Sequence, residues 1–237
     1  MIPTNEDERM EAVRRYDVLD TPPDGTFDRI TRLAAQAFDA PISIISIVDH
    51  DRIWFKSHHG LDASEIGRDP GLCASAICQY EPWLVSDAKL DPRTLDNPLV
   101  VGELGLRFYV GVPLTTSAGH NLGTLNVIDV EPREASEVQL STLRDLAAIV
   151  VDELELRLAT RRTFELRREH ALDLNDDVVQ TLTAAQLALD AGRHEEARSA
   201  VSTALADARQ IVTDLLEESL DGTPLAPGDL VRPAKPG

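Results

Sequence analysis

The strongest restriction on the fold of this chain is a change of hydrophobic period at Ser136. Before Ser136, short β-branched and apolar runs alternate with turn residues, whereas after it apolar residues recur at steps of three and four. The first pattern predicts strands and short helices, and the second predicts long amphipathic helices. A chain of 237 residues has room for both parts, so we expect one α+β domain followed by a helical module.

The part before Ser136 predicts helices around a set of hairpin-connected strands. Helices are expected over Glu6–Val18, Phe27–Phe38 and Gly71–Tyr80. The expected strands are Ile42–Asp49, Arg52–Ser57, Leu84–Asp87, Leu106–Leu114 and Leu122–Ile128. The stretch from Asp91 to Pro98 is rich in turn residues and predicts no regular element. Because most of the strands are joined by short connections, we expect an antiparallel sheet flanked by helices.

The part after Ser136 predicts a long connecting helix and an α-helical hairpin. Ser136 and Gln139 form a capping-box pattern that starts the helix. The apolar stripe is interrupted where Arg161 and Arg162 occupy its positions, which predicts a bend or a frayed turn there. A break at Gly192–His194 separates the last helix. Two helices with one apolar stripe each cannot bury both stripes, so we expect pairing with a second chain into a dimeric four-helix bundle.

The expected dimer interface consists of the stripe positions of this module. These residues are Leu154, Leu158, Ala171, Leu174, Val178, Leu182, Ala185, Ile211 and Leu215. The predicted divisions of the chain are a first domain at 1–158, a helical dimerisation module at 159–220 and a Pro/Gly-rich tail at 221–237. The composition of the tail predicts disorder.

Composition argues against several classes of partner and site. Lys and Arg total 23 against 41 Asp and Glu, a net charge of −18, and aromatic residues make up 4%. We therefore expect no nucleic acid and no membrane partner. The N-terminus lacks a secretory signal and no apolar run could cross a bilayer, so we expect a cytoplasmic protein. The histidines do not show the spacing of a metal site, and none is expected.

Seven short motifs of the first domain occur in a characteristic order. They are Tyr16–Pro23, Phe27–Ile30, Val48–Ser57, Asp87–Ala88 with Asp91–Arg93, Asn97–Leu99, Arg107–Leu114 and Leu122–Asp129. Together they resemble the GAF domains of bacterial signalling proteins, often found ahead of histidine kinases and diguanylate cyclases. The resemblance covers residues 5–158. It implies a small-molecule or redox-sensing pocket between the sheet and the helices over one face. Neither the cyclic-nucleotide signature nor a bilin-binding cysteine context is visible, so ligand and cofactor stay unknown.

Eight residues are candidates for lining this pocket: Cys73, Ser75, Cys78, Asp87, Arg107, Phe108, Tyr109 and Asn126. Phe108 and Tyr109 are neighbours on one strand, so they face opposite sides of the sheet. Asp87 and Arg107 either orient a polar ligand or form an ion pair that holds a loop in place.

The two cysteines raise the question of redox chemistry. Cys73 and Cys78 would point about 140° apart on one helix, which disfavours a disulfide. Small buried thiols are the simpler interpretation, because no third cysteine is present to resolve a sulfenic acid.

The helical module carries a second resemblance. Leu174–Leu182 is similar to the motif Leu-His-Asp-x-Val-x-Gln-x-Leu of the dimerisation and phosphoacceptor helices of one histidine-kinase subfamily. Asn175, followed by Asp176, stands at the phosphoacceptor position, and an amide cannot accept a phosphoryl group. His170 lies about 140° around the helix from that position. Too few residues follow for an ATP-binding domain. The resemblance implies a retained dimer scaffold without kinase chemistry.

These observations predict a non-catalytic cytoplasmic signalling protein. A GAF sensor would act on a homodimeric bundle, which a response regulator, a kinase or a transcription regulator would read. Three alternatives stay open. The chain is a phosphotransfer protein using His170, a redox-active thiol enzyme or sensor using Cys73 or Cys78, or a GAF fold that serves only as an interaction surface.

Overall fold

The computed structural model describes residues 2–217, without the side chains of residues 170, 171, 173 and 214–217. The chain divides into two compact units, Met1–Ala159 and Thr160–Gly237. The tail predicted to be disordered, 221–237, lies outside the described residues. The helices of the first unit are α1 Glu6–Tyr16, α2 Gly25–Phe38, α3 Cys73–Ala76, α4 Pro98–Val101 and the first part of α5 Glu137–Asp173. Its strands are β1 Ile42–Val48, β2 Arg52–His59, β3 Glu65–Gly67, β4 Trp83–Val85, β5 Phe108–Thr115 and β6 Asn121–Asp129.

The strands of residues 2–217 form one antiparallel sheet in the order β3-β2-β1-β6-β5-β4. The predicted hairpins β1–β2 and β5–β6 are present, and β1 pairs with β6 so that Ile42 lies opposite Ile128. The sequence predicted five of the six strands. The missing one, β3, has three residues and exists because it pairs with Arg52–Trp54 at the edge of the sheet. A strand so short has no readable alternation.

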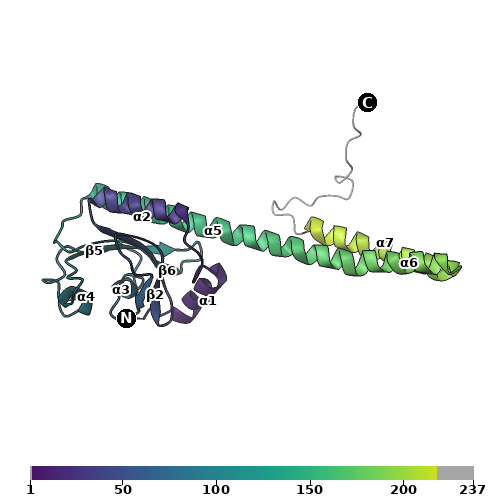
Figure 1. Cartoon of the computed structure of the whole chain (residues 1–237), viewed down its shortest axis with the longest axis horizontal. Coiled ribbons are helices and arrows are strands. Elements are labelled where there is room, and N and C mark those ends of the chain that lie inside the picture. Colours follow the sequence, from purple (N-terminus) through teal and green to yellow (C-terminus); the bar gives the residue numbers. More distant parts are fainter. Residues whose placement is uncertain (1, 218–237) are drawn as a thin grey trace, which may run out of the picture. The chain divides into compact units, whose positions relative to one another are not determined.

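The sheet is covered on both faces. α2 and the first part of α5 cover one face, while α3 and the segment around α4 cover the other (Figure 1). The apolar residues of α1 pack in the same core cluster as those of α2 and α5. Strand β5 contributes side chains to both layers, because Phe108 belongs to the first layer and Tyr109 to the second. The expectation of an antiparallel sheet flanked by helices, with a long helix after it, is confirmed.

The start of α2 is fixed by its N-cap residue. The Asp24 carboxylate accepts a hydrogen bond of 2.8 Å from the Thr26 N–H, which satisfies one of the free donors at the helix end. The same carboxylate forms an ion pair of 2.7 Å with Arg157 of α5. Asp24 therefore joins the two main helices of this face, and the hydrogen bond and the ion pair lower its pKa.

Replacing Asp24 by alanine is expected to lower the free energy of unfolding by about 1–2 kcal/mol, because the cap and the ion pair are lost together. Urea denaturation followed by circular dichroism measures the change. Asn5→Ala is the matched control, since Asn5 caps α1 without a side-chain hydrogen bond, and should change stability by less than about 0.5 kcal/mol. Equal effects of the two substitutions would contradict this role of Asp24.

Two short helices differ from the prediction. The helix expected over Gly71–Tyr80 spans only Cys73–Ala76. Its continuation is prevented because the Asn121 side chain donates hydrogen bonds of 2.9 Å to the carbonyl groups of Ile77 and Gln79. Helix α4 was not predicted: its first residue, Pro98, ends the stretch expected to be rich in turns, although Asn97 caps the helix and Pro98 occupies its first turn. The first error comes from a long-range contact, and the second from a signal that the sequence contained.

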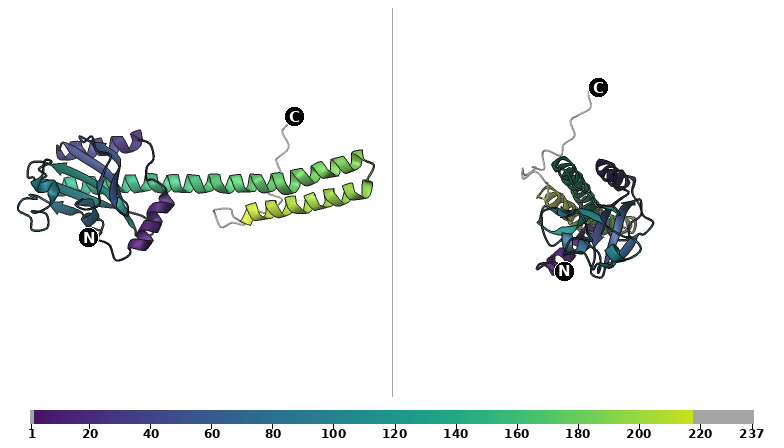
Figure 2. Two further views of the ribbon diagram at one scale, coloured as in Figure 1. Left: turned by 60° about the horizontal axis from the view of Figure 1, so that its bottom comes forward. Right: turned by 90° about the vertical axis from the view of Figure 1, so that its left-hand side faces the viewer.

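The second unit is a helical hairpin. It contains the last part of α5, the π-helical segment η1 Leu174–Val179, α6 Gln180–Asp190 and α7 His194–Glu217. η1 and α6 pack against α7, as the second view shows (Figure 2). Gly192, with a φ of +72°, provides the predicted turn. α5 runs through Arg161 and Arg162 without interruption, so the departure from α-helical geometry lies at η1 and not at the arginines. Long charged side chains can extend into solvent without breaking a helix.

Candidate functional site

Three of the predicted pocket residues meet between α3 and the sheet. Cys73 comes from α3, Tyr109 from β5 and Asn126 from β6. The Tyr109 hydroxyl lies 3.5 Å and the Asn126 Nδ2 atom 3.4 Å from the Cys73 Sγ atom, and both are hydrogen-bonded to it. The Asn126 amide also donates to the Thr124 hydroxyl at 3.1 Å. All of these residues are buried, so polar groups occupy the place where the family resemblance implies a pocket.

This buried group is tightly packed. The Trp83 ring contacts the Tyr109 ring edge-on, with centroids 5.5 Å apart. Burial, followed by the neighbouring Cys73, raises the pKa of the Tyr109 phenol well above its usual value, which leaves the hydroxyl protonated. The Asn126 Oδ1 atom is buried without a hydrogen-bond partner among the described residues. Such an atom costs free energy, which marks Asn126 as the least satisfied member of the group.

The other predicted pocket residues lie elsewhere. Phe108 faces the α2 and α5 layer, away from α3. Ser75 lines a cavity of about 530 Å³, and Cys78 lines another of about 450 Å³. Both cysteines are free. The Cys78 thiol donates to the carbonyl of Ala74, and burial raises its pKa, so it is not an activated thiolate.

Asp87 and Arg107 form the ion pair that was one of their two predicted roles. The Arg107 guanidinium donates two hydrogen bonds, of 2.7 and 2.5 Å, to the Asp87 carboxylate. The hydrogen bonds from Arg107 lower the pKa of Asp87. The Ala88 N–H also donates to the carbonyl of Arg107 at 2.6 Å. This geometry holds the loop after β4 against the start of β5.

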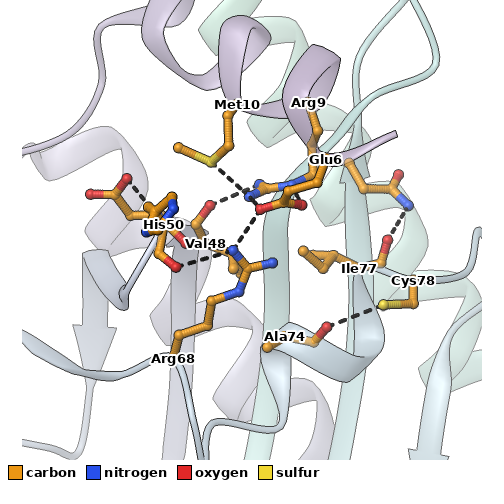
Figure 3. Close-up of polar contacts among 11 residues, drawn as sticks. Glu6, Arg9, Met10, Val48, His50, Arg68, Ala74, Ile77 and Cys78 are labelled. Carbon is orange, nitrogen blue, oxygen red and sulfur yellow. Dashed lines mark hydrogen bonds and ion pairs between the residues drawn. The ribbon is translucent and has the colours of Figure 1, made fainter. Parts of the chain in front are cut away.

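A charge cluster near α3, with one buried and two partly buried members, was not predicted. It consists of Glu6 and Arg9 on α1 and Arg68 in the loop before α3 (Figure 3). The Arg9 side chain is 1% exposed and donates from Nε and Nη2 to the two Glu6 oxygens, each at 2.8 Å. Its Nη1 atom donates to the carbonyl of Val48 at 2.7 Å. Arg68 donates to the same Glu6 carboxylate at 2.5 Å and to the carbonyl of Asp49 at 3.0 Å.

The Glu6 carboxylate therefore accepts hydrogen bonds from two guanidinium groups. Burial raises the pKa of Glu6, but the hydrogen bonds and charges of Arg9 and Arg68 outweigh this effect and lower the pKa to about 2. The Arg68 Nη2 atom is buried and has no hydrogen-bond partner among the described residues. Glu6 and Arg9 stand three positions apart, a spacing that predicts an ion pair on one helix. Arg68 is 62 residues from Glu6, and no local pattern indicates that contact.

The residues at the predicted phosphoacceptor position lie in η1. The Asn175 amide donates to the Asp176 carboxylate at 3.1 Å, and the Gln180 amide donates to the same carboxylate oxygen at 2.9 Å. A π-helical turn often accompanies a functional position. The His170 side chain lies outside the described residues.

The predicted dimer-interface residues lie partly in the first unit and partly in the hairpin. Leu154 and Leu158 are buried in the core of the first unit, which accounts for their apolar character without a second chain. Ala185 and Ile211 are buried, and Val178 is half-buried, within the hairpin. Leu174 and Leu182 are exposed. The side chains of Ala171 and Leu215 lie outside the described residues.

The described residues offer neither a metal site nor a membrane span. Residues 2–217 contain no cluster of His, Cys, Asp or Glu side chains arranged to bind a metal ion. None of the helices described in this range combines the length and apolarity that a membrane span requires.

The comparison with protein families identifies the first unit. The model described as GAF domain matches residues 22–154, which is more than half of the 237 residues. The chain belongs to the GAF domain family, and it is a signalling protein with a GAF sensor domain. This confirms the family inferred from the seven motifs.

Individual relatives add detail. A cyclic di-GMP phosphodiesterase of Pseudomonas aeruginosa is 37% identical over 195 residues, which cover 78% of this chain and 33% of the relative. The chain thus spans about a third of the length of that curated relative. The solved PixJ GAF domain of Thermosynechococcus elongatus, in its blue-light absorbing form, covers 68% of this chain and 96% of its own at 17% identity and a TM-score of 0.50. A free methionine-R-sulfoxide reductase from Neisseria meningitidis covers 66% and 90% at 22% identity, with a TM-score of 0.46.

One functional expectation is corrected by these matches. The sequence was expected to belong to a non-catalytic protein, whereas the curated relative is named as an enzyme, a cyclic di-GMP phosphodiesterase. The expectation rested on Asn175 at a phosphoacceptor position and on the absence of an ATP-binding domain. Those two features bear on kinase chemistry alone, so they were too narrow to exclude other activities.

Proposed function

We propose that this chain is the sensory and coupling part of a cyclic di-GMP signalling protein. The GAF domain responds to a small molecule, and the helical hairpin pairs with its copy in a second chain. A change in the GAF domain alters this pairing and so regulates a cyclic di-GMP phosphodiesterase activity. The observation that carries the proposal is the match to the Pseudomonas aeruginosa phosphodiesterase at 37% identity.

The length of this match supports a role for the helices as well as for the GAF domain. A match that covers 78% of the chain is too long to fit within Met1–Ala159, so it extends into the second unit. The GAF family model, in contrast, ends at residue 154. The relative therefore resembles this chain over part of its helical extension. A sensor that acted through the GAF domain alone would not need such an extension.

The exposed leucines of the hairpin support pairing with a second chain. Within the hairpin, the buried positions of α6 and α7 are mainly alanines: Ala185, Ala188, Ala197 and Ala204. Larger side chains stay exposed, among them Leu174 on η1, Leu182 on α6, and Val201 and Leu205 on α7. A hairpin that buries alanine and exposes leucine has most of its apolar surface still available. A second copy would cover it and complete a four-helix bundle.

The histidine-kinase-like motif fits a scaffold role in this proposal. The Asn175 and Gln180 amides both donate to the Asp176 carboxylate, so the motif forms a polar network that joins η1 to the first residue of α6. Such a segment, with a π-helical turn between two α-helices, is a suitable place for a change of helix geometry. A partner such as a response regulator, a kinase or a transcription regulator would read the resulting arrangement of the paired helices.

The proposal is tested by exchanging this chain for the matching region of the Pseudomonas aeruginosa phosphodiesterase. The chimera should hydrolyse cyclic di-GMP, and Leu182→Glu in the chimera should lower the rate about tenfold or more, because an unpaired charge would enter the helix pair. Leu187→Glu, on another face of α6, serves as the control. A folded, active chimera whose rate is the same with and without Leu182→Glu would contradict coupling through paired helices.

A further inference from the structure

We propose that the Glu6–Arg9–Arg68 cluster is part of a binding site for a small oxyanion, either a carboxylate or a phosphate group. This inference rests on the proposed sensory function and deepens it by naming the chemical class of the ligand. The first argument is charge. Two guanidinium groups share one carboxylate, and the pKa of Glu6 keeps that carboxylate ionised, so the cluster carries one positive charge in excess.

Burial makes this excess charge costly. Arg9 is 1% exposed and the Arg68 side chain 12% exposed. Removing an unbalanced charge from water costs several kcal/mol in proteins unless a partner of opposite sign is near. A bound water could accept a hydrogen bond here but could not balance the charge. An anion does both, which is why the cluster favours an anionic ligand.

The second argument is an unused donor. Every nitrogen of the Arg9 guanidinium has an acceptor, and Arg68 uses Nη1 for Glu6, Asp49 and His50. The Arg68 Nη2 atom has none among the described residues. In Figure 3 the guanidinium nitrogen of Arg68 that carries no dashed line points toward Ile77. An oxyanion is the strongest acceptor available for a guanidinium N–H, because the hydrogen bond is charge-assisted.

The third argument is the space beside the cluster. Arg68 lines the cavity of about 530 Å³ that also contains Ser75, and Arg9 lines the cavity of about 450 Å³ that contains Cys78. Ile2 lines both cavities and is 69% exposed. Each cavity is of a size that binds small molecules.

Other charged groups in these linings set the selectivity. The Arg68 cavity also contains Arg93, whose guanidinium is paired with Asp91, and the carboxylates Asp51 and Asp69. Asp51 and Asp69 are exposed, so water screens their repulsion of an anion. Attraction to an oxyanion therefore depends on direct contact with Arg68 and not on a general positive field. This is consistent with a chain of net charge −18.

The test is isothermal titration of the full chain with sodium phosphate and, separately, sodium acetate at constant ionic strength set with chloride. We expect saturable binding of at least one probe and an affinity at least about tenfold lower in Arg68→Gln. Ser75→Tyr, which adds a bulky ring to the lining of the cavity and leaves Glu6, Arg9 and Arg68 unchanged, should also reduce binding and covers the case in which Arg68→Gln fails to fold. Arg52→Gln, at a surface arginine outside both cavities, should bind as the wild type does.

Each outcome is decisive. Binding of phosphate alone or acetate alone identifies the ligand group, and binding of both supports a general oxyanion site. The inference is overturned if neither probe binds to the wild type. It is also overturned if Arg68→Gln and Ser75→Tyr bind the probe as tightly as the wild type does. Sedimentation of the same samples separates the two proposals, because a dimer that binds no oxyanion contradicts this inference alone, whereas a monomeric wild type contradicts the proposed function.

Discussion

Glu6→Gln is expected to lower the free energy of unfolding by about 3 kcal/mol at pH 7, a large effect for one conservative substitution near a chain terminus. Glutamine preserves the shape of the side chain but removes the single negative charge that Arg9 and Arg68 share. Two buried guanidinium groups would then face each other without a counter-charge. Urea denaturation of the two proteins gives the difference directly.

The effect of this substitution depends on pH in a defined direction. The pKa of Glu6 is about 2 in the folded protein against a usual value of 4.5. Because the folded pKa is the lower one, the ionised group stabilises the fold fully above pH 4.5, and this contribution is lost as pH falls toward 2. The stability difference between wild type and Glu6→Gln should therefore be constant from pH 7 to about 5 and should shrink below that.

Comparing the two proteins isolates Glu6 from other carboxylates. Asp24, Asp87 and Asp91 also have lowered pKa values, so the stability of the wild type alone would fall in acid for several reasons. Their contributions cancel in the difference. Glu11→Gln, an exposed position on α1, should change stability by less than about 0.5 kcal/mol. A difference that stays constant down to pH 3 would show that Glu6 does not serve as the shared carboxylate.

The sequence predicted those parts of the fold that depend on local pattern. The buried run of β1 and the paired runs of β5 and β6 are apolar enough to be assigned without a structure, and the helix expected over Phe27–Phe38 is α2, which begins two residues earlier at Gly25. Predictions failed where a distant residue decides the local structure. Asn121 ends α3 by taking the carbonyl groups of Ile77 and Gln79, and β3 exists through its pairing with β2.

The candidate site was less predictable for the same reason. Cys73, Tyr109 and Asn126 were all named from the sequence, and they meet between α3 and the sheet. Their mutual contacts could not be predicted, because the spacing of residues on separate strands does not reveal sheet order. The ion pair between Glu6 and Arg9 is readable from helical spacing, whereas the participation of Arg68 depends on where the loop before α3 lies.

Leu182→Glu is expected to convert the chain from a dimer to a monomer. Leu182 is 45% exposed on α6, so a glutamate there is tolerated within one chain but would be buried in a helix pair. Burying an unpaired carboxylate at an interface costs enough to weaken association about a hundredfold or more. Leu187 is 62% exposed on the same helix and points about 140° away, so Leu187→Glu is a control of equal charge and similar helix position.

Sedimentation equilibrium of these three proteins tests the pairing of the helices most directly. The wild type and Leu187→Glu should sediment with twice the mass of one 26.0 kDa chain, and Leu182→Glu should sediment with the mass of one chain. Circular dichroism of the same samples confirms that each variant is folded. A wild type that stays monomeric as its concentration is raised, or a Leu182→Glu variant that dimerises as tightly as Leu187→Glu, would contradict the proposal that the hairpin transmits the GAF signal through a second chain.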